Sequence, residues 1–220
     1  MTDAVTSREN PRWYTPSNLP EELTAFDETL EDALGVGAVG KVGLLDLALS
    51  RAAGLTRVRR HYQRAPLHVY RPIYLDDRQP DMAFLFVQQF GEGLVQGDRY
   101  RIDIDCGPGS ATHITTQAAT NIYGAQRNFA TQLVNLRAGA GAVLEYLPGP
   151  VVPFRGARVF QRTSVTAART SVSRARPTSS SPRARSRRTA RPAVAAISPS
   201  IPSMMSGVGW LCWWRIDPPC

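Results

Sequence analysis

From residue 39 onward the chain consists of short apolar runs separated by Gly, Pro or Asp, at intervals typical of β-strands. The runs are rich in Val, Leu, Ile, Tyr and Phe, which favour extended structure. No pattern typical of a long helix lies between them, so successive strands are expected to pair antiparallel. The sequence therefore predicts a mainly β fold, a sandwich-like scaffold of antiparallel stacked sheets with few short helices. The expected strands are residues 42–51, 55–63, 67–75, 82–90, 98–106, 111–119, 129–137, 142–147 and 157–165.

The stretch GEGLVQGDRYRIDI, residues 91–104, combines three glycines with an alternation of apolar and polar residues. Alternation with a period of two predicts a half-buried strand, with the apolar residues from Tyr100 to Ile104 on its buried face. The opposite face, which carries Asp103 and Asp105, is expected to be solvated. Glycine loops that bind phosphate open a helix, whereas this cluster opens a strand. A tight turn or bulge is therefore expected here.

Residues 1–36 are expected to form a polar N-terminal leader with several prolines and an acidic patch. In this patch Leu23, Phe26, Leu30 and Leu34 recur at helical spacing. Two interpretations stay open, a short amphipathic helix and a mostly disordered leader. The leader has no apolar run behind a basic start, and no apolar run in the chain reaches the roughly 18 residues of a membrane span. The chain is therefore expected to be neither secreted nor membrane-spanning.

Charge is distributed unevenly along the chain. The net charge is +8, but residues 1–165 hold 17 basic and 17 acidic residues. Residues 166–220 hold nine arginines and one acid, in a basic segment rich in Arg, Ser and Pro. The chain uses Arg 25 times and Lys once, as a GC-rich coding sequence would, so this segment is expected to be disordered or read out of frame. The alternative is a basic disordered arm that binds RNA or DNA through phosphates.

No catalytic constellation emerges from the sequence. The histidines at positions 61, 68 and 113 lie on separate expected strands without metal-ligand spacing, and there is no Gly-X-Ser-X-Gly motif. The three cysteines are scattered, which favours the reducing cytoplasm. Asp98 has the position of a turn cap. Glu145 lies between Leu144 and Tyr146 with no histidine or lysine nearby in the sequence, so it is expected to be partly buried and to need an arginine partner or a polar channel.

Four blocks occur in order along the chain, namely RAPLHVYRPIY, GLVQGDRYRIDIDCGPGSATHITTQAATNIY, LEYLPGPVVPF and GARVFQRTSV. In this order and at these distances they resemble the urease accessory protein UreD family, also called UreH, over about residues 37–165. Four ordered blocks are far more specific than a single glycine motif. The resemblance ends near residue 166, where the basic segment begins.

The resemblance implies a non-enzymatic, mostly β scaffold in the cytoplasm. Proteins of this family bind urease apoprotein with the accessory proteins UreF and UreG and assist nickel insertion into the urease active site. Nickel would be in transit through a polar tunnel, with no stably bound cofactor. Oxygen ligands suit such a path because they replace hydration water without the grip of thiolates. The competing hypothesis is a nucleic-acid-binding β-domain with a basic disordered arm.

The resemblance carries three candidate residues of the nickel path over to this chain. Asp98 matches the acid that ends the family's Gly-Gly-Asp block, Thr120 matches a small hydroxyl position near the tunnel, and Glu145 matches the acid of the Leu-Glu-aromatic-Leu-Pro block. The chain departs from the family at Gln96, where glycine is frequent, and at Asn121, where lysine is common. The second departure removes a positive charge at that position.

Overall fold

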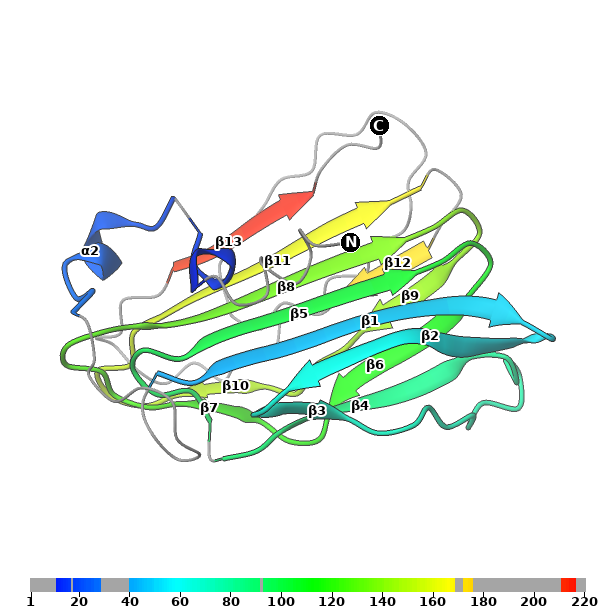
Figure 1. Ribbon diagram of the computed structural model, residues 1–220, viewed down its shortest axis with the longest axis horizontal. Helices are drawn as coiled ribbons and strands as arrows, with labels where there is room; N and C mark the ends of the chain where they lie inside the picture. The colour runs from blue at the N-terminus through cyan, green and yellow to red at the C-terminus, as the bar shows by residue number, and fades with distance from the viewer. Residues whose placement is uncertain are drawn as a thin grey trace.

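The structure is a computed structural model that describes residues 11–16, 18–28, 40–91, 93–168, 172–175 and 211–216. Its strands form two broad layers, with two short helical segments near one end of them (Figure 1). These segments are a 3-10 helix at Pro11–Tyr14 (η1) and an α-helix at Glu21–Thr24 (α2). The expected mainly β class with few short helices is confirmed. None of the helices in the described ranges is long and apolar enough to cross a membrane.

Within the described residues the strands belong to three sheets. Sheet A contains Val42–Ala52 (β1), Leu55–Arg64 (β2), Arg99–Cys106 (β5), Ala130–Ala138 (β8), Val159–Ala167 (β11) and Leu211–Ile216 (β13). Sheet B contains Leu67–Val69 (β3), Ala83–Gln89 (β4), Ala111–Thr116 (β6), Val143–Tyr146 (β9) and Val172–Ala175 (β12). Sheet C pairs Thr120–Ile122 (β7) with Val151–Pro153 (β10). The strand order is β13-β11-β8-β5-β1-β2 in sheet A and β12-β9-β6-β4-β3 in sheet B.

From β5 onward the chain winds as a coil. It passes from β5 in sheet A to β6 in sheet B and β7 in sheet C, returns to sheet A as β8, and repeats the circuit through β9, β10 and β11. In each circuit the chain enters a given sheet in the same direction as before, and the new strand lies beside the strand of the previous circuit. Neighbouring strands are therefore parallel, as seen for β5 and β8, β8 and β11, β6 and β9, and β7 and β10.

Antiparallel pairing was expected throughout and is wrong for most strand pairs. Among the described strands, β1 with β2 and β3 with β4 are antiparallel, whereas the remaining pairs are parallel. Parallel neighbours need a long crossover connection, which in many proteins is a helix. Here strands of the other two sheets make that crossover, so a sequence without long helices still forms parallel sheets.

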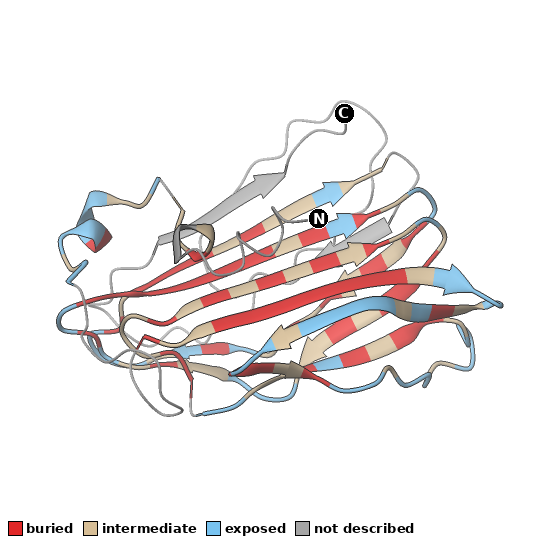
Figure 2. Cartoon of the chain, viewed as in Figure 1, coloured by how far each residue is buried: buried red, intermediate tan, exposed pale blue. Residues whose placement is uncertain are grey.

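The main core lies between sheets A and B. On β5 buried and half-buried residues alternate along the whole strand, as the sequence predicts, whereas the neighbouring β1 is buried continuously over most of its length (Figure 2). Ile102 of β5 has Leu45 of β1 and Val134 of β8 as register partners, so apolar side chains form rows across the sheet. On the opposite face Asp103 forms an ion pair with Arg101 at 2.7 Å. The face expected to be solvated is thus half-buried and internally paired.

Each expected strand segment contains an observed strand, although residues 67–75 shorten to β3. The strands β7 and β10 were not expected, because three residues are too few to show an alternation. Residues 166–220 include the end of β11 and the short strands β12 and β13. From residue 169 onward the rest of that segment lies outside the described residues, as do Leu30 and Leu34 of the expected leader helix.

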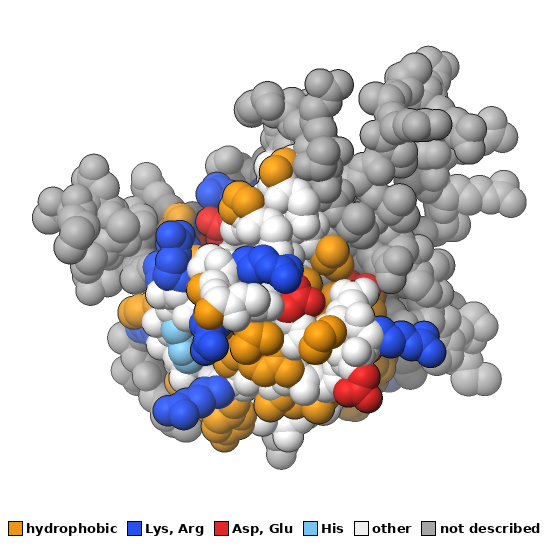
Figure 3. All heavy atoms as spheres, turned by 90° about the vertical axis from the view of Figure 1, so that its right-hand side faces the viewer, with side chains coloured by type: hydrophobic (Ala, Val, Ile, Leu, Met, Phe, Trp, Pro, Cys, Tyr) orange, Lys and Arg blue, Asp and Glu red, His pale blue; other side chains and the backbone are white. Residues whose placement is uncertain are grey.

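Strand β2 forms one edge of sheet A. In the described part of the chain it pairs with β1 alone, and most of its side chains are exposed, although Thr56 is buried and Val58 packs against the core. The turn between β1 and β2 lies at the right-hand end of the molecule in Figure 1, which Figure 3 shows face-on. On that end basic side chains surround a group of hydrophobic ones (Figure 3).

Candidate functional site

A cavity of about 220 Å³ lies where the three sheets meet. Sheet A contributes Gln132, sheet B contributes Gln89 and Thr116, and sheet C contributes Thr120 and Asn121. These side chains offer hydroxyl and amide groups, and no carboxylate is among the described residues that line the cavity. The site can therefore bind a polar ligand through uncharged hydrogen-bond donors and acceptors.

Hydrogen bonds to neighbouring groups hold two of its polar side chains in place. The Oε1 atom of Gln132 accepts a hydrogen bond from Nε2 of Gln161 at 2.6 Å. The Thr116 hydroxyl donates to the backbone oxygen of Ala118 at 2.9 Å and accepts from the N–H of Gly149 at 2.8 Å. Both side chains thus face the cavity in a fixed orientation.

The glycine-rich stretch forms one wall of the cavity. Gly93 has a φ of 138°, and a Cβ atom there would lie 2.2 Å from the backbone oxygen of Asn121. The same oxygen accepts a hydrogen bond from the Leu94 N–H at 2.8 Å. Gly97 has a φ of 82°, and the Asp98 N–H closes a turn on the Val95 oxygen at 3.1 Å. The expected turn is confirmed, and the glycines allow the chain to pack closely against β7.

The carboxylate of Asp98 is fully buried and receives four donors. Its Oδ1 accepts from the Lys41 backbone N–H at 2.9 Å and lies 3.3 Å from Lys41 Nζ. Its Oδ2 accepts from the Val95 N–H and from the Tyr100 hydroxyl, each at 3.1 Å. Burial raises the pKa of Asp98 above its ordinary value, although the Val95 N–H and Lys41 pull it down. Asp98 thus ties the start of β5 to the residue that precedes β1.

Thr120 and Glu145 occupy different parts of the molecule. Thr120 begins β7 and lines the cavity, and its N–H donates to the Pro150 oxygen at 2.9 Å. Glu145 lies on β9 between two core residues, so its side chain is on the outer face of sheet B. There its Oε2 lies 2.9 Å from Nδ1 of His113, whose ring packs against Phe84 with centroids 4.9 Å apart. The partner of Glu145 is thus a histidine 32 residues away in the sequence, where an arginine or a polar channel was expected.

The three candidates of the nickel path do not share one cavity. Thr120 lines it, whereas Asp98 and Glu145 are not among its lining residues. Nor do the described residues contain a cluster of three His, Cys, Asp or Glu side chains that could hold a metal ion. Sequence reasoning missed Gln89 and Gln132, because glutamines on separate strands carry no signal until the register is known.

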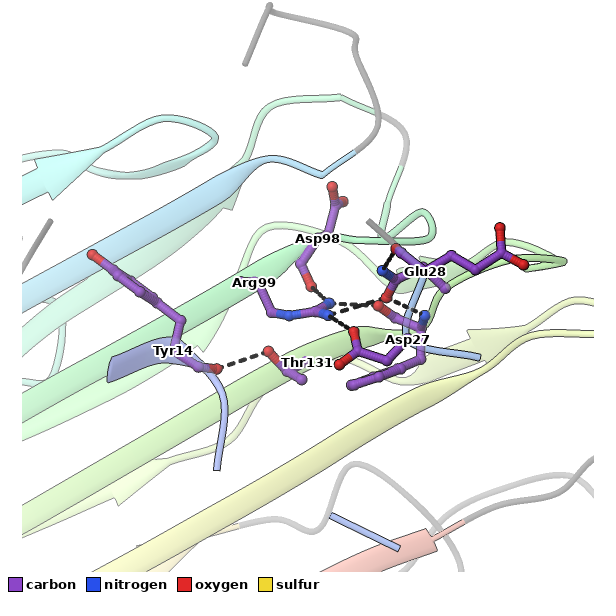
Figure 4. Close-up of polar contacts among 8 residues, drawn as sticks. Tyr14, Asp27, Glu28, Asp98, Arg99 and Thr131 are labelled. Carbon is purple, nitrogen blue, oxygen red and sulfur yellow. Dashed lines mark hydrogen bonds and ion pairs between the residues drawn. The ribbon is translucent and has the colours of Figure 1, made fainter. Parts of the chain in front are cut away.

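A second polar network ties the N-terminal residues to sheet A (Figure 4). Arg99, at the start of β5, donates to the backbone oxygen of Asp98 at 3.1 Å and lies 3.7 Å from a carboxylate oxygen of Asp27. The Thr131 hydroxyl donates to the Tyr14 carbonyl oxygen at 2.9 Å. Burial lowers the pKa of Arg99, while the two aspartates raise it. The described part of the leader is thus bound to the strands beside the buried Asp98.

Comparison with known proteins identifies the family. A family model described as UreD urease accessory protein matches residues 41–175. The chain belongs to this family. Urease accessory protein UreD 2 of Streptomyces griseus is 45% identical over 140 residues, which are 64% of this chain and 48% of that protein. Urease accessory protein UreD of Cenarchaeum symbiosum is 42% identical over 128 residues, which are 58% of this chain and 45% of that protein.

The family match extends further along the chain than the expected end of the resemblance, and it covers only part of each relative. The resemblance to UreD is confirmed, but the match runs to residue 175 and includes β12, whereas the sequence predicts an end near residue 165. Urease accessory protein UreD 3 of Methylorubrum populi is 41% identical over 147 residues, 67% of this chain and 47% of that protein. The chain spans about half the length of the relatives that it matches.

Proposed function

We propose that the chain is a non-enzymatic scaffold of urease maturation, which binds urease apoprotein together with UreF and UreG in the cytoplasm and assists nickel insertion. Membership in the family of urease accessory proteins supports this role. The relatives are accessory proteins, and the cavity presents amides and hydroxyls in place of a nucleophile with a base. Such a lining suits transient binding better than catalysis.

The observation that carries the proposal is the oxygen-bearing cavity at the junction of the three sheets in a UreD-family fold. Nickel is the cargo, and hydroxyl and amide oxygens would replace part of its hydration shell without holding it tightly. Thr120 is the candidate that lies on this cavity. Its hydroxyl would contact the passing ion directly.

Asp98 and Glu145 would act at other points of the path. The Asp98 carboxylate is already engaged by Lys41, so nickel would have to compete with an ammonium group for it. The pair of Glu145 with His113 presents a carboxylate and an imidazole, both of which are ligands for Ni²⁺ in proteins. The side chains of this pair are 17% and 20% exposed, so an ion at the surface of sheet B can reach them.

The partner proposal is tested by mixing the purified full chain with urease apoprotein and UreF and separating the mixture by size-exclusion chromatography. We expect the three proteins to elute together. Separate elution of the chain under conditions in which UreF is folded would contradict the proposal. UreG is added in a second run, where it should join the same peak.

A further inference from the structure

The edge strand β2 carries an unusual concentration of positive charge. Residues 47–75 contain six arginines and no acidic residue, although residues 1–165 as a whole are neutral. Two of the six arginines are used in ion pairs, Arg51 with Asp81 and Arg60 with Asp46. Positive charge is therefore concentrated in this part of the chain, although residues 1–165 have zero net charge.

The other four arginines form a surface that we call the basic edge. They are all exposed, and none of them forms an ion pair with another described residue. They are Arg57, Arg59, Arg64 and Arg71. Exposed guanidinium groups without an acidic partner attract negative charge from solution and bind carboxylates through two parallel hydrogen bonds.

The backbone beside the basic edge is open over a short window. At one end of β2 the Thr56 N–H donates to the Asp81 oxygen at 3.0 Å, and the Tyr74 hydroxyl donates to the Thr56 oxygen at 2.6 Å. At the other end the Gln63 side chain accepts from the Val69 N–H at 3.0 Å. Between them, Arg57, Val58, Arg60 and His61 pair with β1 alone in the described part of the chain, and the register shifts at Arg59, which has no partner on β1.

A strand paired on one side directs every second N–H and C=O outward, where they can pair with an added strand. The segment that follows β3 carries exposed apolar side chains, and one of them contacts Thr56 at the end of this window. Tyr70 is 61% exposed, Leu75 is 60% exposed and Tyr74, which contacts Thr56, is 38% exposed. The window thus offers backbone pairing, positive charge and apolar contact together.

We propose that β2 accepts an extended acidic peptide segment of a partner protein as an additional strand of sheet A. Charge complementarity selects the acidic residues, and the alternating donors and acceptors of the backbone select a peptide over a nucleic acid, which cannot continue the ladder. The arginines also repel the same edge of a second copy, so they exclude self-pairing while leaving an acidic partner favoured. None of these residues lines the cavity, so the inference goes beyond the proposed function.

The test measures binding of a short fluorescent peptide that alternates Glu and Val to the full chain by fluorescence anisotropy. We expect binding that weakens with salt, and no binding of the matching peptide of Lys and Val. The double variant Arg57→Glu with Arg59→Glu should weaken binding by at least about tenfold, because attraction becomes repulsion. The control reverses Arg78 and Arg155, two exposed arginines outside the basic edge, and should change binding by less than about threefold.

Both double variants contain the basic residues 166–220. The difference in affinity between the two variants therefore does not include binding of the peptide to that segment. Hydrogen exchange locates the peptide. Amide protons within residues 57–61 should exchange more slowly in the complex, as expected for an added strand. Equal weakening by the two double variants, unchanged exchange at these residues, or displacement of the peptide by single-stranded DNA of equal charge would overturn the proposal.

Discussion

Replacing Gly93 with alanine should destabilise the fold far more than the same change at Gly54. A Cβ atom at Gly93 would lie 2.2 Å from the backbone oxygen of Asn121 and 2.8 Å from its carbonyl carbon. To restore van der Waals contact, β7 or the loop would have to move by about 1 Å. That shift breaks the hydrogen bond from the Leu94 N–H to the Asn121 oxygen. The φ of 138° adds strain for any residue with a Cβ.

The two costs can be estimated separately. Backbone strain of this kind costs about 1–3 kcal/mol, and the lost hydrogen bond costs about 0.5–1.5 kcal/mol. The free energy of unfolding of Gly93→Ala should therefore fall by about 1.5–4.5 kcal/mol. At Gly54, in the turn between β1 and β2, φ is 80° and no atom lies within 4 Å of the added Cβ. Only the strain applies there, about 1 kcal/mol.

Urea unfolding followed by circular dichroism measures both free energies. Equal losses at Gly93 and Gly54, or a loss below about 1 kcal/mol at Gly93, would refute the reasoning that close approach to β7 requires this glycine. Because Gly93 also lines the cavity, the variant links fold stability to the shape of the candidate site.

Three further predictions concern buried groups. Burial raises the pKa of Asp98, so the native state keeps the proton of this carboxyl group to higher pH than the unfolded chain does. The stabilising contribution of Asp98 is therefore lost as the pH rises from about 4 through the native pKa. In Asp98→Asn that part of the pH dependence of the free energy of unfolding should vanish, and an unchanged profile would contradict the assignment. Burial raises the pKa of the Cys106 thiol to about 11. In a chain whose other two cysteines are replaced by serine, a thiol reagent at neutral pH should therefore react with Cys106 only after unfolding. Rapid reaction in the native state would contradict the burial of this thiol. Leu23 packs against Phe129, so Leu23→Ala should lower the free energy of unfolding by about 2–3 kcal/mol and speed proteolysis of the leader, whereas the exposed Glu22→Ala should change neither.

The positions of the strands could be predicted from the sequence because side chains alternate between a buried and a solvated face. On β5 this alternation holds from Arg99 to Cys106. The direction of pairing could not be predicted in the same way. It depends on which sheet each strand enters, and the alternation is the same for a strand with parallel or antiparallel neighbours.

Contacts between side chains on neighbouring strands could not be predicted from the sequence either, because they depend on the pairing register. His113 and Glu145 are 32 residues apart and meet because β6 and β9 pair in parallel with these two residues opposite each other. Gln89 and Gln132 come together in the cavity from different sheets. By contrast, the role of Asp98 in a turn was foreseen, because its cause is local: the acid follows Gly97 and accepts from the Val95 N–H.

The amount of nickel bound to urease tests the central claim most directly. The measurement uses cells that lack their own UreD-family protein and express urease, UreF, UreG and this chain. We predict that the chain raises the nickel content per urease, that Thr120→Val reduces this gain, and that the exposed Thr166→Val on sheet A does not. Nickel contents that are the same with and without the chain would contradict the role in urease maturation, and equal effects of the two threonine variants would contradict the cavity as the path.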